Sequence, residues 1–166
     1  MLAARIERGA RGDGTRDFFA EVVERRCRVS SAAMKLDEIG TCLAADGWPV
    51  EVLSETTVQS RFRGKTRVFP MLVHTDGAFV TFAVLPYARA PEEPEDADEL
   101  LRQLLRWNRQ MNLAKFSIDE DDDVVLSVEY RLADLDPSEI RDAVDVVSFY
   151  ADKYHDEVGA LLAAAS

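Results

Sequence analysis

The sequence has little of what catalytic, redox and membrane proteins commonly carry. It contains two cysteines, Cys27 and Cys42, and two histidines, His74 and His155. The cysteines lie too far apart for a CxxC motif, and neither histidine has a second histidine or a cysteine at ligand spacing. No apolar run is long enough for a membrane helix, and the first residues lack the apolar core of a secretory signal. We therefore expect no catalytic residue, cofactor, metal or membrane contact, and a cytoplasmic location.

Charge separates the beginning of the chain from the rest. The 166 residues carry 20 basic and 31 acidic side chains, a net charge of -11, which disfavours direct binding of nucleic acid. Residues 1–28 nevertheless hold seven arginines against five acidic residues. We predict an N-terminal extension, residues 1–31, that is partly flexible or helical. A single domain, residues 32–166, follows, and the hydrophobic content of 47% is sufficient for its core.

Apolar periodicity predicts the elements of this domain. A helix follows Ser30 or Ser31 and stops at Gly47, and four short β-rich stretches occupy about residues 51–87. An acidic, proline-rich linker leads into a helix over about residues 96–111. Two alternating stretches come next, and Asp136 is the predicted N-cap of a last helix. The pattern predicts an α+β fold, an antiparallel β-sheet flanked by helices in the order α-ββββ-α-ββ-α.

Two charged clusters require interpretation. DEDDD, residues 119–123, fails the EF-hand spacing because Val124 and Tyr130 occupy the positions that need glycine and glutamate. The alternation on both sides favours a hairpin tip, with weak cation binding as the alternative. The second cluster lies on the hairpin around Gly64 and could bind an acidic partner segment or simply be solvated; it comprises Arg61, Arg63, Lys65 and Arg67.

The helix over residues 96–111 has a wider apolar face than one packing layer requires. Its apolar residues span about 160°, whereas a helix on one layer needs ~100°. A homodimer or a bound partner chain would cover the excess, and a wide core with a few exposed aromatics is the alternative. The candidate interface residues are Leu100, Leu104, Trp107 and Met111 on this helix, with Phe149 on the last helix.

Two segments carry a resemblance to a known family. LLRQLLRWNRQMNLAKFSIDEDDDVVLSVEYRL, with the helix after it, resembles the second half of YbjN-domain proteins, and MKLDEIGTCLAADGWPVEV resembles their first helix and strand. This bacterial family is labelled a sensory transduction regulator and is similar in fold to the small dimeric chaperones of type III secretion systems. Asn108, Phe116 and Ile118 match its pattern as structural residues. Asn108 would tie the helix to the following turn, and Phe116 and Ile118 would lie in the core.

The resemblance implies a function without catalysis. We expect a dimeric protein-interaction module, chaperone-like or regulatory, that binds itself and a segment of an unidentified protein client. The alternative is a small-molecule-binding sensory or regulatory domain. An extended apolar groove would favour the first hypothesis, and a closed concave pocket with convergent polar groups would favour the second.

Overall fold

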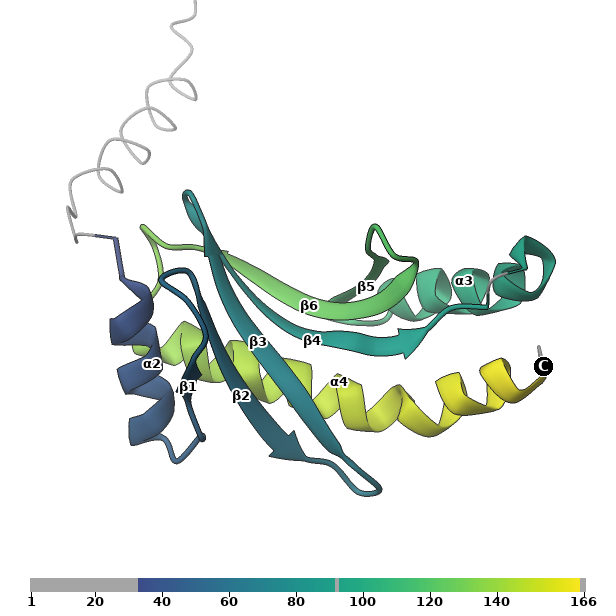
Figure 1. Ribbon diagram of the computed structural model, residues 1–166, viewed down its shortest axis with the longest axis horizontal. Helices are drawn as coiled ribbons and strands as arrows, with labels where there is room; N and C mark the ends of the chain where they lie inside the picture. Colours follow the sequence, from purple (N-terminus) through teal and green to yellow (C-terminus); the bar gives the residue numbers. More distant parts are fainter. Residues whose placement is uncertain (1–32, 92, 165–166) are drawn as a thin grey trace, which may run out of the picture. The chain divides into compact units, whose positions relative to one another are not determined.

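Helices and strands follow one another in the order that the sequence predicts. The structure, a computed structural model, describes residues 33–91 and 93–164 (Figure 1), so the predicted extension over residues 1–31 lies outside the described residues. The helices are α2 (Leu36–Ala45), α3 (Pro94–Asn108) and α4 (Pro137–Ala164). The strands are β1 (Glu51–Val52), β2 (Thr57–Arg63), β3 (Val68–Asp76), β4 (Phe79–Arg89), β5 (Lys115–Ile118) and β6 (Asp123–Arg131). These elements confirm the α+β prediction.

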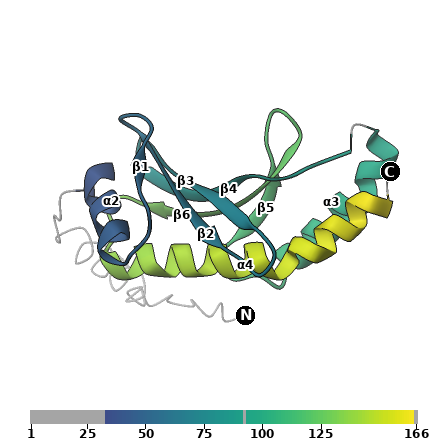
Figure 2. The same ribbon diagram turned by 60° about the horizontal axis from the view of Figure 1, so that its bottom comes forward.

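The strands form one antiparallel sheet in the order β1-β2-β3-β4-β6-β5. Helix α4 runs along one face of this sheet and contacts β4 and β6 (Figure 2). Helix α2 packs on α4 and β2, and α3 packs on α4 and β5. The opposite face of the sheet carries no helix among the described residues. The domain therefore has two layers and one core between them.

Burial alternates along the strands and places the core on the helical face. Phe69, Phe82 and Leu126 on the central strands are fully buried, and the residues between them turn to the other face. Helix α4 meets them with buried residues at helical spacing: Ile140, Ala143, Val144, Val147, Tyr150, Ala151, Tyr154 and Val158. Truncating a buried phenylalanine to alanine costs about 3–5 kcal/mol, so this contact supplies much of the stability.

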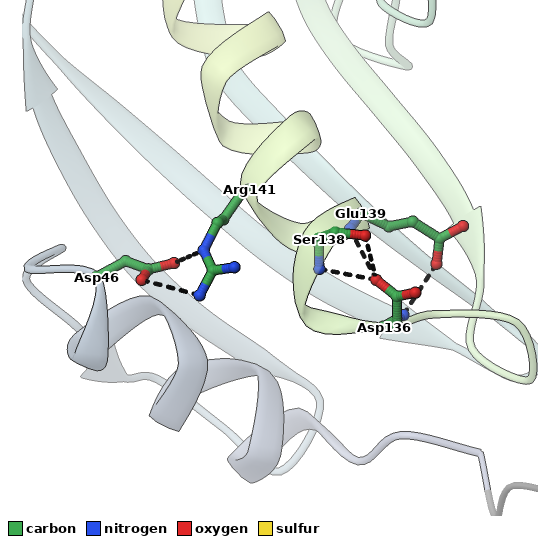
Figure 3. A network of polar contacts seen from close by, with 5 residues as sticks. All are labelled: Asp46, Asp136, Ser138, Glu139 and Arg141. Atoms are coloured by element: carbon green, nitrogen blue, oxygen red, sulfur yellow. Dashed lines mark hydrogen bonds and ion pairs between the residues drawn. The ribbon is translucent and has the colours of Figure 1, made fainter.

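The start of α4 is capped as the sequence predicts (Figure 3). A carboxylate oxygen of Asp136 accepts hydrogen bonds from the amides of Ser138, at 2.7 Å, and Glu139, at 3.2 Å, while Glu139 accepts one from the Asp136 amide at 2.8 Å. The Ser138 hydroxyl and these amides lower the pKa of Asp136. The cap is therefore complete at neutral pH and is lost when Asp136 is protonated in acid. Arg141 also pairs with Asp46, at 2.7 Å, which links α4 to the end of α2.

Two helix boundaries differ from the prediction. Helix α2 begins at Leu36 rather than after Ser31, because the Met34 amide donates to the Leu132 carbonyl at 3.2 Å and the N-cap residue Lys35 has an extended backbone. The capping box is formed by Lys35, whose amide donates to the Glu38 carboxylate at 2.7 Å. Helix α3 ends at Asn108, three residues earlier than predicted. Asn108 is therefore the last residue of the helix.

A chain that begins at Met34 should fold without the N-terminal extension. Every described helix and strand begins after this residue, and the core contains no earlier residue among those described. We expect cooperative urea unfolding, followed by circular dichroism, with a midpoint close to that of the full chain. Aggregation, or loss of a cooperative transition, would show that the extension belongs to the core.

Candidate functional site

Four of the five predicted interface residues lie inside the domain. Leu100, Leu104, Trp107 and Met111 are only 1–5% exposed. The first three lie on the side of α3 that packs on α4 and β5, and Met111 lies in the segment between α3 and β5. The Trp107 ring stacks on that of Tyr154 with 4.6 Å between centroids. This corrects the prediction for these four residues, since a buried side chain offers no surface to a second subunit. The single-domain core uses most of the wide apolar face of the helix.

A smaller apolar surface remains between α3 and β5. We call it the α3–β5 surface; it comprises Leu101, Leu105 and Ile118. Leu105 is 68% exposed and Ile118 is 48% exposed, while Leu101 is partly buried. A groove of about 270 Å³ lies here, lined by Leu101, Leu104, Leu105, Phe116, Ser117 and Ile118. Apolar side chains clustered in this way are typical of a protein contact surface.

Phe116 and Ile118 differ in burial although they share a face of β5. Phe116 is buried at 5% exposure and contacts the rings of Tyr87 and Trp107, in the core where it was expected. Ile118 is 48% exposed, which corrects its predicted place in the core. It is the last residue of the edge strand β5 and borders the groove that β5 forms with α3.

Asn108 closes the outer edge of β5. Its side-chain amide donates to the Phe116 carbonyl at 2.9 Å, and its side-chain carbonyl accepts from the Phe116 amide at 2.7 Å. These are the two bonds that a neighbouring strand would make at this position. The Lys115 ammonium bonds the carbonyl of Met111 at 2.8 Å beside them. The middle of this sheet edge is therefore not available to an added strand.

The opposite edge of the sheet is open along part of β2. Strand β1 has two residues and pairs only with Val58 and Gln59. The Gly64 amide points toward the β3 side, because it donates to the Arg67 carbonyl. The Thr57 carbonyl points toward the β1 side, because it accepts from the Leu53 amide. Because backbone groups alternate along a strand, those of Arg61 and Arg63 point away from β3, where β1 no longer runs. We call residues 60–63 the β2 edge.

Two grooves flank the β2 edge, one on each face of the sheet. The outer groove, about 390 Å³, is lined by Pro49, Val50, Glu51, Gln59, Ser60, Arg61, Val68 and Pro70. The inner groove, about 740 Å³, lies between β2 and α4 and is lined by Trp48, Phe62, Arg63, Gly64, Lys65, Ser148, Phe149, Asp152 and Lys153. Phe149, the fifth predicted interface residue, is 60% exposed here.

The β2–β3 turn is held against α4 beside the inner groove. The Lys65 amide donates to the Asp152 carboxylate, which also pairs with the Lys65 ammonium at 3.4 Å. The backbone hydrogen bond from Lys65 is the main cause of the lowered pKa of Asp152. A Cβ atom on Gly64 would lie 2.7 Å from the Phe69 ring and 2.5 Å from the Asp152 carboxylate. Glycine is therefore required for the turn to approach the helix this closely.

Charge differs between the two grooves. Arg61 and Arg63 have exposed side chains and no ion-pair partner within the described residues. In the inner groove the Lys65 charge is paired with Asp152, and the Lys153 ammonium lies 5.8 Å from the centre of the Phe149 ring. The outer groove therefore presents the unpaired charge of Arg61, and the inner groove, which Arg63 borders at one end, presents the aromatic side chains of Trp48, Phe62 and Phe149.

The acidic cluster forms the turn between β5 and β6. A carboxylate oxygen of Asp119 accepts from the amides of Asp121, at 3.0 Å, and Asp123, at 2.9 Å, and Asp122 has a φ of 60°. This is the predicted hairpin tip, built by local bonds of one aspartate. In residues 33–91 and 93–164 no group of three or more His, Cys, Asp or Glu side chains is arranged to hold a metal ion.

One buried hydroxyl group, that of Tyr87, connects the sheet to the helical layer. The Tyr87 hydroxyl donates to the Ala151 carbonyl at 2.9 Å and so joins β4 to α4. Burial raises the pKa of Tyr87 far above its ordinary value, which keeps the phenol neutral. His74 bonds the Thr57 hydroxyl at 2.9 Å, and His155 lies edge-on against Phe69.

None of the helices in the described part of the chain combines the length and apolar character that a membrane crossing requires.

Comparison with known proteins agrees with this architecture. Residues 35–160 match the model of the YbjN family, described as "Putative bacterial sensory transduction regulator". The chain belongs to the YbjN family. No curated protein matches it. The family match begins at the first described helix and ends within α4, so it covers the whole two-layer domain.

Two solved structures share the fold of this YbjN-family chain. The crystal structure of YbjN from E. coli is 13% identical with a TM-score of 0.55, and the match covers 77% of this chain and 96% of that one. A chain of the heterodimeric ExoU–SpcU complex, from the type III secretion system of Pseudomonas aeruginosa, is 20% identical with a TM-score of 0.52. That match covers 75% of this chain and 97% of the other. The fold is therefore the one expected from the resemblance.

The closed edge of β5 can be tested by removing the Asn108 side chain. Asn108→Ala should lower the free energy of unfolding by about 1–3 kcal/mol, because the amide and carbonyl of buried Phe116 lose their partners. Asn112→Ala is the matched control, since Asn112 is exposed and its side chain makes no hydrogen bond in the structure. Urea unfolding of both variants gives the difference. Equal stability of the two variants would contradict the role assigned to Asn108.

Proposed function

We propose that this YbjN-family chain is a non-enzymatic, homodimeric protein-interaction module, chaperone-like or regulatory, that binds a segment of a partner protein. The observation that carries the proposal is that the domain leaves two separate surfaces uncovered, the α3–β5 surface and the β2 edge. One suits a second copy of the chain, and the other suits a different polypeptide. The similarity in fold to a chain of a two-protein complex supports a binding role.

Self-complementary charge favours a dimer through the α3–β5 surface. Along the exposed side of α3, Asp98 precedes Leu101 and Leu105, and Arg109 follows them. A two-fold axis between the leucines would run the two α3 helices antiparallel and place Leu101 against Leu105 of the second copy. The same axis brings Asp98 near Arg109 of that copy. Opposite charges then meet at both ends of an apolar centre.

A charge in the centre of this surface should dissociate the dimer. We expect a wild-type dimer at micromolar concentration and a monomer for Leu105→Arg, because a central apolar residue contributes about 2 kcal/mol or more to association. The exposed position of Leu105 predicts a near-native melting temperature for the variant. Leu53→Arg is the control, since Leu53 is half-exposed directly after β1, at the edge of the sheet opposite to β5. Light scattering measures the masses, and a monomeric wild type would refute the dimer.

Charge reversal tests the orientation of the two helices. Asp98→Arg and Arg109→Asp should each weaken the dimer, and the double variant should recover most of the loss because opposite charges face each other again. Sedimentation equilibrium of the three variants measures the dissociation constants. Loss in both single variants without recovery in the double variant would exclude the antiparallel arrangement while leaving dimerisation itself intact.

A further inference from the structure

We infer that the β2 edge binds an extended segment of a partner protein as an added β-strand, and that this segment alternates acidic with apolar residues. The inference rests on the proposed function and names the chemistry of the partner. Acidic side chains of the segment would lie toward the outer groove, and apolar side chains would lie toward the inner groove. The backbone of the segment would pair with Arg61 and Arg63.

The backbone of β2 supplies the first part of the argument. Four groups, the amides and carbonyls of Arg61 and Arg63, point to the side where β1 has ended. Arg61 and Arg63 are two residues apart, which is the spacing that an added strand requires. In such a strand the backbone amide and carbonyl of every second residue face the neighbouring strand. Pro49, which precedes β1, has no amide hydrogen and cannot extend the β1–β2 ladder to Arg61.

The two grooves supply the second part. Side chains of an added strand point alternately to the two faces of the sheet, and a groove is present on each face beside the β2 edge. On the inner face, Trp48 and Phe62 lie edge to face with 6.2 Å between ring centroids, and Phe149 is exposed opposite them on α4. These rings offer apolar surface to every second residue of the segment.

Charge selects the other residues of the segment. Strand alternation turns Arg61 and Arg63 to the outer face, where Arg61 lines the outer groove, while Arg63, at the end of β2, also borders the inner groove. Glu51 is the single acidic side chain that lines the outer groove. The domain around them is strongly acidic, since residues 29–166 carry 13 basic and 26 acidic residues. A segment with acidic residues at alternate positions is attracted to this patch and is repelled by most of the remaining surface.

The same charges disfavour two other occupants. A second copy paired along its own β2 edge would bring Arg61 and Arg63 against the same arginines. Residues 1–28 of the chain carry seven arginines against five acidic residues, so they do not complement the patch either. The β5 edge is excluded as an equivalent site because Asn108 occupies its backbone groups.

Synthetic peptides test the inference directly with the full chain. The probe is a fluorescent ten-residue peptide that alternates Glu and Val; one comparison peptide has Lys in place of Glu, and another has the same residues in blocks. We expect saturable binding of the alternating Glu peptide by fluorescence anisotropy, and binding at least about tenfold weaker for both comparison peptides. Peptides N-methylated at every second residue should also bind at least about tenfold weaker when the methyl groups face β2.

Protein variants locate the binding surface. Arg61→Glu combined with Arg63→Glu should reduce affinity for the Glu peptide at least about tenfold and improve binding of the Lys peptide. Phe149→Ala should weaken binding of the Glu peptide and of the Lys peptide, since it removes apolar contact without changing charge. Arg131→Glu is the control, because Arg131 is exposed and distant from the β2 edge. All variants should keep the wild-type circular dichroism spectrum.

The outcomes separate this inference from the proposed function. No binding of the Glu peptide, equal binding by the Arg61 and Arg63 variant, or equal binding of the N-methylated peptide would each overturn strand addition at the β2 edge. Light scattering on the same protein samples reports dimerisation independently. A dimeric protein that ignores the peptide would overturn only the inference, and a monomer that binds it would overturn only the dimer.

Discussion

The structure depends on the contact between α4 and one face of the antiparallel sheet. This helix provides the second layer for β4 and β6, and the Tyr87 hydroxyl fixes its position by bonding the Ala151 carbonyl at 2.9 Å. All the large buried side chains gather on that face. Because this one core supplies most of the stability, folding does not require the other face of the sheet or the β2 edge. Those surfaces are therefore free for binding.

The two edges of the sheet have opposite properties. At β5, the side chain of Asn108 takes the place of a missing strand and satisfies the backbone of Phe116. At β2, the covering strand is only two residues long and leaves Arg61 and Arg63 unpaired. An unprotected edge exposes a protein to nonspecific strand pairing. The arginines at this edge reduce that hazard by repelling a second copy of the same edge.

Local patterns in the sequence were sufficient to predict the order of elements, the Asp136 cap and the acidic hairpin. They were not sufficient to divide the apolar face of α3 between core and surface. Trp107 and Leu105 both lie on that face, and only the tertiary position of α4 decides that the first is buried and the second exposed. Alternation likewise assigned Ile118 to the same face of β5 as Phe116. It did not predict that Ile118, at the end of this edge strand, is 48% exposed. The open β2 edge depends on the length of β1, which propensity does not determine.

The attachment of the β2–β3 turn to α4 has a consequence for the thermodynamics of recognition. Asp152 holds the Lys65 amide, and Gly64 permits the close approach, so the strand that ends at Arg63 is already fixed before any partner arrives. The entropic cost of association then falls almost wholly on the incoming segment. Partners that are stiff and extended in isolation would bind this template more tightly than flexible ones of the same composition.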